Sequence, residues 1–449
     1  MTGTRTGVLT RPEGGWGRAR PRSTAALPAV IVVQGAALAV LAGLDGSPVW
    51  RVARVLGVIA VTGLAAWFTW RVGRAARGGT ALVLGTAGTV VGAGVTGAQA
   101  TAGLGTTAVV AGFVLATGLV LLVWGVALLV RAMRGWWRLL AIPAALALLW
   151  FAVFPVATAV FATNRPPGAL GSATPASYGL PYRDVAFRAG DGVRLSGWFI
   201  APRNGAAVLL LPGAGSTRAA VLGQGAVLAS HGFGALLLDG RGHGRSGGHT
   251  MDFGWWGGPD IAAAVSFLAR QPGVRPDKIA VLGESMGGEQ AIAAMGADPQ
   301  IRAVIGEGVT GEQLADHGWM MHGITGVLDT GMEWVMYTAA GLISGAPRPM
   351  AIPDAIRAAA PRQVLIIAGG AVTSEPIAAR WFQAASPATV HIWVVPGAGH
   401  TQGLATAPRP WAARVISFLN TALHPAITAS PGTGTTASLR GLRDLREGG

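Results

Sequence analysis

A serine lies between two glycines in the segment Gly283-Glu284-Ser285-Met286-Gly287, which follows the apolar run IAVLG and precedes a predicted helix. Glycines on both sides of a serine permit a sharp turn from strand to helix, which lifts the hydroxyl group clear of the sheet. The N-terminus of the following helix directs positive potential at that hydroxyl group. We therefore expect Ser285 to be a nucleophile, provided that a base lies close to it.

The elements that must position this serine alternate along residues 182–424. Residues 184–200 alternate apolar and polar side chains around Asp191-Gly192, which predicts a β-hairpin. Further strands are predicted near 206–211, 234–238, 278–283, 301–306, 363–368 and 389–395. Helices are predicted near 217–230, 258–270, 286–296, 376–385 and 409–423. This order indicates an α/β fold with a mostly parallel, doubly wound sheet, which binds ligands at the carboxyl ends of its strands.

With these motifs in place, residues 182–424 resemble the α/β-hydrolase superfamily, in particular its esterase, thioesterase and peptidase-like branches. Three segments carry the resemblance: the serine turn, the sequence LPGAG at 211–215, and the loop DGRGHGRS at 239–246. The family commonly has a His-Gly turn where this chain has Pro212-Gly213. The resemblance implies an oxyanion hole formed by the backbone N–H groups of Ala214 and Met286.

The resemblance also implies a base near the end of the chain, after the nucleophile and the acid. His400 has this position, since it lies just past the predicted strand VHIWVV, in the sequence PGAGH, and precedes the last predicted helix. His243, within the DGRGHGRS loop, is interpreted as a structural residue of that loop.

The acid departs from the family pattern, because Val372 stands where the family commonly has an aspartate. Glu375 lies three residues further along the same loop, and its longer side chain could reach His400. Glu307, just past the preceding strand, is the alternative acid. Both carboxylates remain open at this point.

The N-terminal part of the chain is strongly apolar. Runs near 26–44, 52–70, 80–100, 107–130 and 139–162 are each long enough to cross a bilayer core, which predicts five transmembrane helices within residues 23–163. Residues 1–163 contain thirteen arginines and only two acidic residues. These arginines lie in clusters between the apolar runs, so they indicate topology more than nucleic-acid binding, which we do not expect.

The arginine clusters predict which side each loop faces. Five arginines precede the first apolar run, three follow the second at 71–77, and three follow the fourth at 131–138. Loops rich in arginine stay in the cytoplasm. Five spans would then place the hydrolase domain outside the cytoplasm, on a multi-pass protein of the cell membrane.

The expected organisation is a basic N-terminus at 1–22, a transmembrane bundle at 23–163, a linker at 164–181, the hydrolase domain at 182–424, and a disordered tail at 425–449. The strand and helix alternation lapses between 308 and 349, where Met and Trp are frequent, which predicts a lid. Such adaptable apolar side chains suit a small-molecule or lipid-like acyl substrate, although they could equally pack the lid onto the sheet or contact the bilayer.

The chain has no cysteine, which excludes disulfides, thiolate metal sites and a cysteine nucleophile. No metal or other cofactor is expected. The sequence thus predicts a membrane-anchored serine hydrolase that acts on an ester or thioester, with amide hydrolysis as a variant. The alternative is a hydrolase-fold domain that has lost catalysis and serves as a membrane-tethered binding or scaffold protein. Oligomeric state and substrate identity have no signature in the sequence.

Overall fold

The computed structural model describes residues 25–44, 48–101, 103, 105–248, 252–321 and 323–423. The chain divides into two compact units, with the boundary between Phe161 and Ala162. The predictions made for the N-terminus at 1–22 and for the tail at 425–449 lie outside the described residues.

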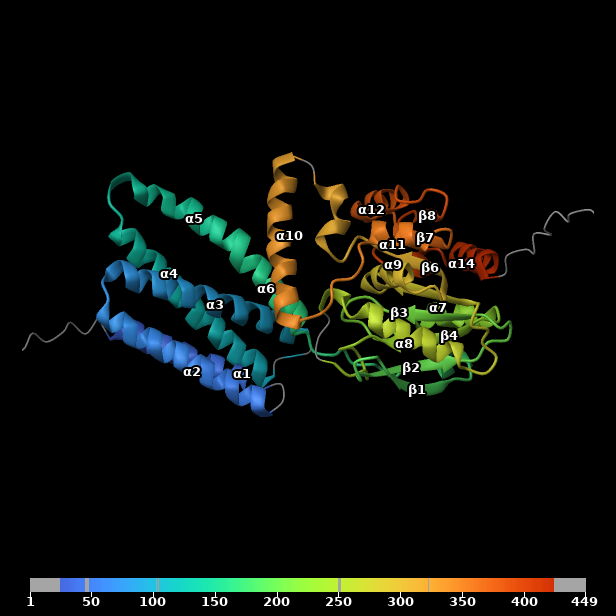
Figure 1. Ribbon diagram of the computed structural model, residues 1–449, viewed down its shortest axis with the longest axis horizontal. Helices are drawn as coiled ribbons and strands as arrows, with labels where there is room; N and C mark the ends of the chain where they lie inside the picture. The colour runs from blue at the N-terminus through green and yellow to red at the C-terminus, as the bar shows by residue number, and fades with distance from the viewer. Residues whose placement is uncertain are drawn as a thin grey trace, which may run out of the picture. The chain divides into compact units, whose positions relative to one another are not determined.

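The described residues of the first unit form helices joined by short connections, without a β-strand among them (Figure 1). Its long helices are α1 (Ala26–Ala42), α2 (Pro48–Arg71), α3 (Arg74–Ala100) and α4 (Thr106–Ala132). A final helical run from Gly135 to Thr163 comprises a 3-10 turn (Gly135–Leu140), α5 (Ala141–Leu148), a π-helical turn (Leu149–Val153) and α6 (Phe154–Thr163). Helices α3 and α4 approach closely, since a Cβ atom on Gly92 would lie 2.3 Å from the backbone N of Leu115.

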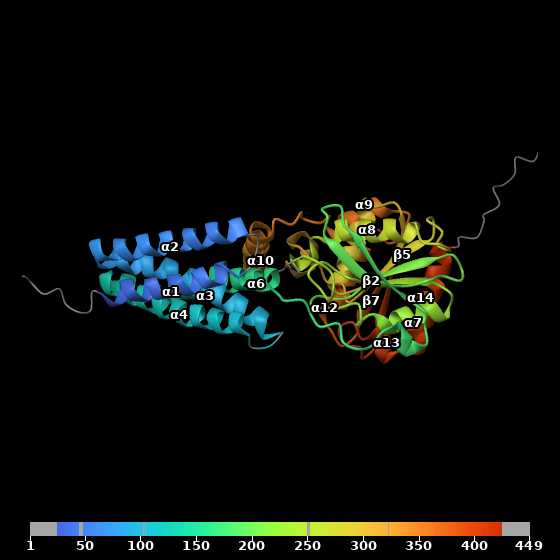
Figure 2. The same cartoon turned by 90° about the horizontal axis from the view of Figure 1, so that it is seen from below.

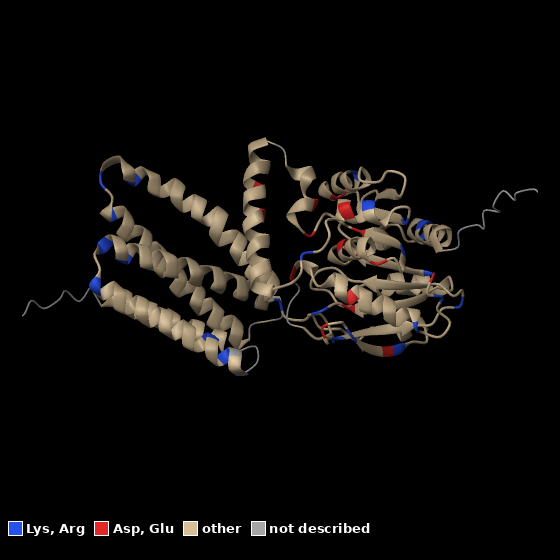
Figure 3. Ribbon diagram, in the orientation of Figure 1, with Lys and Arg blue, Asp and Glu red and all other residues tan. Residues whose placement is uncertain are grey.

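Four of these helical segments, rather than the five expected, are long and apolar enough to cross a membrane. They are Arg51–Arg71, Arg74–Ala100, Thr106–Ala132 and Gly135–Thr163. The first apolar run does form a helix, but α1 has only 17 residues. The positions of charged residues in this unit lie toward the ends of its helices (Figure 3).

The second unit is built on one sheet of eight strands in the order β1-β2-β4-β3-β5-β6-β7-β8. The first two are β1 (Arg183–Arg188) and β2 (Arg194–Ile200), which form the expected hairpin and pair antiparallel. The remaining strands run parallel to one another: β3 (Ala207–Leu211), β4 (Gly234–Asp239), β5 (Ile279–Glu284), β6 (Ile301–Glu307), β7 (Gln363–Gly369) and β8 (Val390–Val395). The expected doubly wound, mostly parallel sheet is therefore confirmed.

Helices cover both faces of this sheet, so the unit has two hydrophobic cores (Figure 2). One face packs against α8 (Gly257–Ala269), α9 (Met286–Ala297), α11 (Ile352–Ala359) and α12 (Ser374–Gln383). The other face packs against α7 (Leu222–Ser230) and α14 (Pro408–Leu423), and the short helix α13 (Gly403–Thr406) precedes α14. Strands β3 to β6 are buried on both faces, which explains their nearly continuous apolar sequences.

The strand order reverses between β3 and β5, which are neighbours although β4 lies between them in the sequence. In doubly wound sheets a crevice forms at such a point, outside the carboxyl ends of the two strands. Leu211 at the end of β3 pairs with Gly283 on β5, so the LPGAG segment and the serine turn emerge side by side.

Two segments differ from the sequence predictions. The helix expected at 217–230 begins only at Leu222, and residues 218–221 form turns. The predicted lid region contains 3-10 turns at Leu314–Asp316 and Gly318–Met320, followed by the 22-residue helix α10 (Gly323–Ser344). Helix α11, directly after this region, was not predicted at all.

Candidate active site

Ser285 stands on the turn between β5 and α9, with φ 51° and ψ −123°. This conformation is sparsely populated for a residue with a side chain and costs about 1–3 kcal/mol, which the surrounding structure must offset. The backbone N–H of Ser285 donates a hydrogen bond to the carbonyl oxygen of Glu307 at 2.7 Å. Within the described residues, the Ser285 hydroxyl group makes no hydrogen bond, so its oxygen is available for reaction.

The glycine before the serine is required by close packing. A Cβ atom on Gly283 would lie 2.2 Å from the carbonyl carbon and oxygen of Gly287, on the first turn of α9. No larger residue fits at Gly283, because real Cβ atoms do not approach backbone atoms this closely. The expected sharp turn between strand and helix is therefore present.

Two backbone N–H groups flank the serine. Gly213, next to Ala214, lies against Ser285, since a Cβ atom on Gly213 would be 3.3 Å from the Ser285 Cβ. In the described part of the chain, neither the N–H of Ala214 nor that of Met286 donates to another protein atom. Free donors on both sides of a nucleophile are the arrangement that stabilises an oxyanion.

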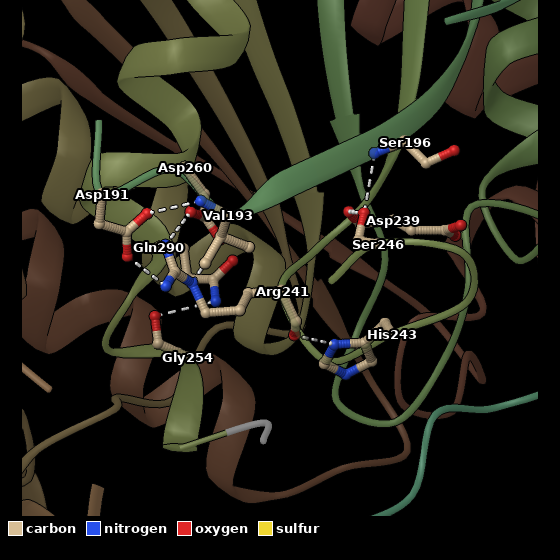
Figure 4. Close-up of polar contacts among 10 residues, drawn as sticks. All are labelled: Asp191, Val193, Ser196, Asp239, Arg241, His243, Ser246, Gly254, Asp260 and Gln290. Carbon is tan, nitrogen blue, oxygen red and sulfur yellow. Dashed lines mark hydrogen bonds and ion pairs between the residues drawn. The ribbon is translucent and has the colours of Figure 1, made fainter. Parts of the chain in front are cut away.

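His243 supports the segment that carries Ala214. Its Nε2 accepts a hydrogen bond from the N–H of Gly215 at 3.0 Å, and its Nδ1 donates to the carbonyl oxygen of Arg241 at 2.7 Å (Figure 4). These two bonds need a neutral ring with the proton on Nδ1. Burial lowers the pKa of His243, which favours this neutral form. The sequence motif gave no indication of this contact.

His400 and Glu375 form a hydrogen bond in which His400 Nδ1 and Glu375 Oε1 are 2.7 Å apart. The second carboxylate oxygen, Oε2 of Glu375, accepts the N–H of Gly369 at 2.6 Å. Glu375 lies in the first turn of α12 and is only 1% exposed, whereas His400 is half exposed. The imidazole is thus fixed at Nδ1 and open to solvent on its other side.

The charge state of His400 follows from this contact. The hydrogen bond to Glu375 raises the pKa of His400, while partial burial opposes the shift. Glu289 and Glu307 act in the same direction through their negative charges. The site therefore stabilises the imidazolium form, which a general base must adopt after it takes a proton.

Glu307, the alternative acid, makes different contacts. Its Oε1 accepts the N–H of Gly403 at 2.6 Å, and its Oε2 accepts Nε1–H of Trp411 at 2.9 Å. No hydrogen bond joins Glu307 to His400 among the residues that the structure describes. Burial raises the pKa of Glu307. Of the two candidate carboxylates, Glu375 is the one hydrogen-bonded to the histidine.

The serine turn and the histidine meet through the segment Glu307-Gly308. Glu307 accepts the N–H of Ser285, and the next residue, Gly308, lies against the ring of His400. A Cβ atom on Gly308 would be 2.9 Å from Cε1 of His400. No hydrogen bond joins the Ser285 hydroxyl to His400 in the described ranges, a common finding in unliganded sites, where such bonds are long.

A further buried acid, Glu284, immediately precedes Ser285. Its Oε1 accepts a short hydrogen bond from Nε2 of Gln224 on α7. Burial, together with the nearby charge of Glu307, raises the pKa of Glu284 to about 8. At neutral pH this group is therefore mostly a neutral carboxylic acid, a property that the sequence does not reveal.

Helix α10 of the predicted lid region contacts other residues of the second unit through polar and aromatic side chains. Nδ1 of His317 lies 2.8 Å from Oε2 of Glu333, and the Tyr337 ring stacks on Trp255 at a centroid distance of 6.0 Å. A cavity of about 370 Å³ adjoins them. Its lining consists of Trp255, Gln313, Leu314, Ala315, Met321, Trp334, Tyr337, Thr338 and Arg348. Among the described side chains, no group of three or more His, Asp or Glu residues could hold a metal ion.

Among known protein families, the model described as serine aminopeptidase, S33, matches residues 202–328 of this chain. This match contains Ser285 and the oxyanion segment but ends before Glu375 and His400. A polyketide transferase from a Penicillium species is 34% identical over 137 residues, which are 28% of this chain and 44% of that protein. A thiohydrolase from Aspergillus aculeatus is 32% identical over 134 residues, or 28% of this chain and 40% of that protein. The chain thus matches less than half the length of these relatives.

Solved structures are also similar to the second unit. An esterase from Pyrococcus furiosus is 23% identical, with a TM-score of 0.49, and the alignment covers 58% of this chain and 98% of the esterase. A dienelactone hydrolase from Anabaena variabilis is 17% identical, with a TM-score of 0.39, over 53% of this chain and 97% of that protein.

Proposed function

We propose that this chain, whose second unit is an α/β hydrolase, is a membrane-anchored serine hydrolase that cleaves an ester or thioester through an acyl-enzyme intermediate. The observation that carries the proposal is the hydrogen bond between His400 and Glu375, on a site that also holds a strained serine and two free N–H donors. The absence of an aspartate at Val372 would favour the alternative scaffold role, in which catalysis is lost. The contact between Glu375 and His400 counts against this alternative, because it supplies a carboxylate beside the imidazole.

In the first half of the reaction, Oγ of Ser285 attacks the substrate carbonyl carbon while Nε2 of His400 takes the hydroxyl proton. The N–H groups of Ala214 and Met286 donate to the oxygen that becomes negative. Glu375 keeps the proton on Nδ1 and stabilises the imidazolium that forms. The imidazolium then protonates the leaving alcohol or thiol as the bond from carbonyl carbon to leaving group breaks.

In the second half, a water molecule gives a proton to the neutral Nε2 of His400 and attacks the acyl carbon. The bond to Oγ of Ser285 breaks, the serine regains its proton from His400, and the free acid leaves. Ester and thioester substrates are favoured because their leaving groups need little assistance. The names of the similar proteins, a thiohydrolase and an esterase, agree with this range.

The serine assignment is tested with a fluorophosphonate probe on the full chain in detergent. Labelling is expected for the natural protein and for Ser417→Ala, a matched control on the exposed side of α14. Labelling should disappear in Ser285→Ala, because the probe reacts only with an activated serine. Labelling that survives in Ser285→Ala would overturn the assignment.

The membrane anchor rests on the four segments that could span a bilayer. The arginines at 71–77 and those at 131–138 are separated by two such segments, so they lie on one side of the membrane, which is cytoplasmic for arginine-rich loops. One more segment then separates the second cluster from the hydrolase unit. This unit is therefore extracytoplasmic, whether or not α1 also crosses.

Topology can be measured directly because the natural chain has no cysteine. Ser417→Cys places one thiol on the exposed surface of the hydrolase unit. A membrane-impermeant maleimide should label this thiol in intact cells from which any outer layer has been removed. Labelling that appears only after permeabilisation would contradict the extracytoplasmic placement.

A further inference from the structure

Helix α10 has an inner face that packs on the hydrolase unit. Glu333 pairs with His317, Tyr337 stacks on Trp255, and a Cβ atom on Gly326 would lie 2.8 Å from the carbonyl oxygen of Met320. These three helix residues are 7 and 4 positions apart, which places them on one side of the helix. The inner face is therefore occupied by the unit's own residues.

The opposite face of α10 is largely apolar, although Val335 is half-buried and Thr338 lies beside it. Ile324, Leu328, Val335 and Leu342 are separated by 4, 7 and 7 residues, so they form one stripe. Ile324 is 79% exposed and Leu342 is 83% exposed, near the two ends of the helix. Both acidic residues of α10, Asp329 and Glu333, follow Gly326 at helical spacings of 3 and 7, which puts them on the inner side. Figure 3 shows the helix uncharged elsewhere.

Such a stripe is costly in water, because each fully exposed large aliphatic side chain gives up about 1.5–3 kcal/mol of burial free energy. Trp334 flanks the stripe, is 60% exposed and lines the cavity of about 370 Å³. Tryptophan favours the level where lipid headgroups meet acyl chains. The composition therefore suits a lipid surface better than water.

The hydrolase unit follows closely in sequence after the last segment that could span a membrane. The last segment that could span a membrane ends at Thr163, and Arg165 already lies against Gly215, the residue after Ala214. A Cβ atom on Gly215 would be 2.1 Å from Cζ of Arg165. The two steps of backbone from Thr163 to Arg165 can span at most about 7 Å. Only Asn164 therefore lies between the end of this segment and the first residue that contacts Gly215 of the hydrolase unit.

We infer that the outer face of α10, defined by Ile324, Leu328, Val335 and Leu342, inserts into the surface of the bilayer, and that the substrate is an amphiphile whose acyl chain enters from that lipid layer. This inference rests on the proposed function, since it needs both the anchor and the acyl substrate. The cavity beside Trp334 gives the acyl chain a lining of Met321, Tyr337 and Trp255.

The test uses the full chain with single cysteines at the outer face, Ile324→Cys and Leu342→Cys, each labelled with an environment-sensitive fluorophore. Asp354→Cys is the control, because this exposed position on α11 carries a charge in the natural protein. The labelled proteins are reconstituted into vesicles of phosphatidylcholine and phosphatidylglycerol. Quenching is then measured with iodide in the aqueous phase and with lipids that carry a nitroxide on the acyl chain.

The outer probes should be quenched by nitroxide lipids at least about twofold more than the Asp354 probe, and by iodide correspondingly less. Iodide quenching equal to that of the control would show a face in water and overturn the inference. Protection from both quenchers would show that protein covers the face, either this chain's own helices or a second copy, and would also overturn it.

A second pair of measurements separates this inference from the proposed function. In Ile324→Ser/Leu342→Ser we expect hydrolysis of a long-chain p-nitrophenyl ester embedded in vesicles to fall about tenfold, because two inserted side chains are lost. Hydrolysis of p-nitrophenyl acetate in solution should not change, since neither residue contacts the catalytic groups. If the double variant hydrolyses both esters at the natural rates, the inferred lipid contact is wrong, whereas the proposed serine hydrolase activity is unaffected. If the natural chain hydrolyses neither ester, the proposed function fails first.

Discussion

The imidazole Nδ1 of His400 lies 2.7 Å from Oε1 of Glu375, on a carboxylate that is almost fully buried. The other oxygen of this carboxylate is held by the N–H of Gly369, so the acid has little freedom to turn away. In the proposed mechanism this geometry holds the ring for proton transfer at Nε2, the nitrogen that would face Ser285.

Replacing Glu375 by glutamine should reduce kcat for p-nitrophenyl acetate by about 10³–10⁴-fold and leave KM nearly unchanged. The amide cannot stabilise the imidazolium as a carboxylate does, although its size is the same. The control is Asp354→Asn, which removes an exposed carboxylate on α11. A kcat for Glu375→Gln within a few-fold of the natural value would mean that another group is the triad acid.

The pH dependence of the reaction should report the same contact. Because the pKa of His400 is raised above its ordinary value of 6.5, the neutral base becomes available only at higher pH. We expect kcat/KM to increase with pH through a midpoint above 6.5, and the midpoint to move lower in Glu375→Gln. The stabilising effect of the pair on folding changes in the opposite direction: it is complete below pH 6.5 and is lost as the pH rises through the raised pKa of His400. A natural midpoint below 6.5 would contradict this interpretation.

Glu307 should position the histidine loop without acting as the acid. Its two oxygens hold Gly403, three residues past His400, and Trp411 on α14. In Glu307→Gln the side chain keeps one acceptor oxygen, so it loses the hydrogen bond from either Gly403 or Trp411. The N–H group of that residue then faces the NH₂ group of the glutamine side chain, which cannot accept it. We expect kcat to fall about tenfold with little change in KM. Loss of the buried charge should also lower the pH midpoint, because Glu307 raises the pKa of His400.

The matched control for this variant is Trp411→Phe, which removes the indole N–H donor together with part of the buried ring but keeps the Gly403 contact. It should cost less activity than Glu307→Gln and leave the pH midpoint unchanged. Equal effects of the two variants on rate and midpoint would show that Glu307 stabilises α14 alone and does not position the histidine.

The central strands could be predicted because residues buried on both faces of a sheet must be apolar at nearly every position. Strands β3 to β6 are buried on both faces apart from Arg302 in β6, so each appears as a nearly continuous apolar run. The serine and histidine motifs lie directly after such runs, which is why their positions at the sheet edge could be inferred. Local pattern was sufficient wherever an element's surroundings are uniformly apolar.

Local pattern failed where distant contacts decide the structure. Residues 218–221 were predicted as helix, but the N–H of Arg218 donates to Asp239 Oδ1 at 2.8 Å and its buried guanidinium lies over Trp198. These tertiary contacts hold a turn against the local helix propensity. The choice between Glu307 and Glu375 depended on Gly403 and Trp411, which are 96 and 104 residues from Glu307. No spacing rule reveals such partners.

Gly308 should be essential for the position of the histidine ring. Its φ is +72°, and a Cβ atom would lie 2.9 Å from Cε1 of His400 and 3.1 Å from Cγ2 of Thr401. Gly308→Ala therefore combines backbone strain of about 1–2 kcal/mol with displacement of the ring. The rate of fluorophosphonate labelling at Ser285 should decrease about tenfold or more. Gly258→Ala is the control, because a Cβ atom there meets nothing within 4 Å. Equal labelling rates in the two variants would contradict a tight contact between residue 308 and the ring.

The buried acid Glu284 leads to the last prediction, which concerns stability. Its pKa is raised from 4.5 to about 8 by burial and by the charge of Glu307, so the folded chain binds this proton more tightly than the unfolded chain. The folded state is therefore favoured below pH 4.5 and loses this advantage as the pH rises through about 8. Glutamine has the size of the neutral acid and can still bond Gln224, but it never ionises.

Glu284→Gln should consequently melt at nearly the natural temperature in acid and several degrees higher in alkali, about 5 °C or more near pH 9. The measurement is a thermal unfolding curve of the hydrolase unit within the full chain, at matched detergent and salt, from acid to alkaline pH. Asp277→Asn, at an exposed carboxylate, should shift the curve little at any pH. A gap between Glu284→Gln and the natural chain that stays constant with pH would mean that the buried acid does not titrate in the folded state.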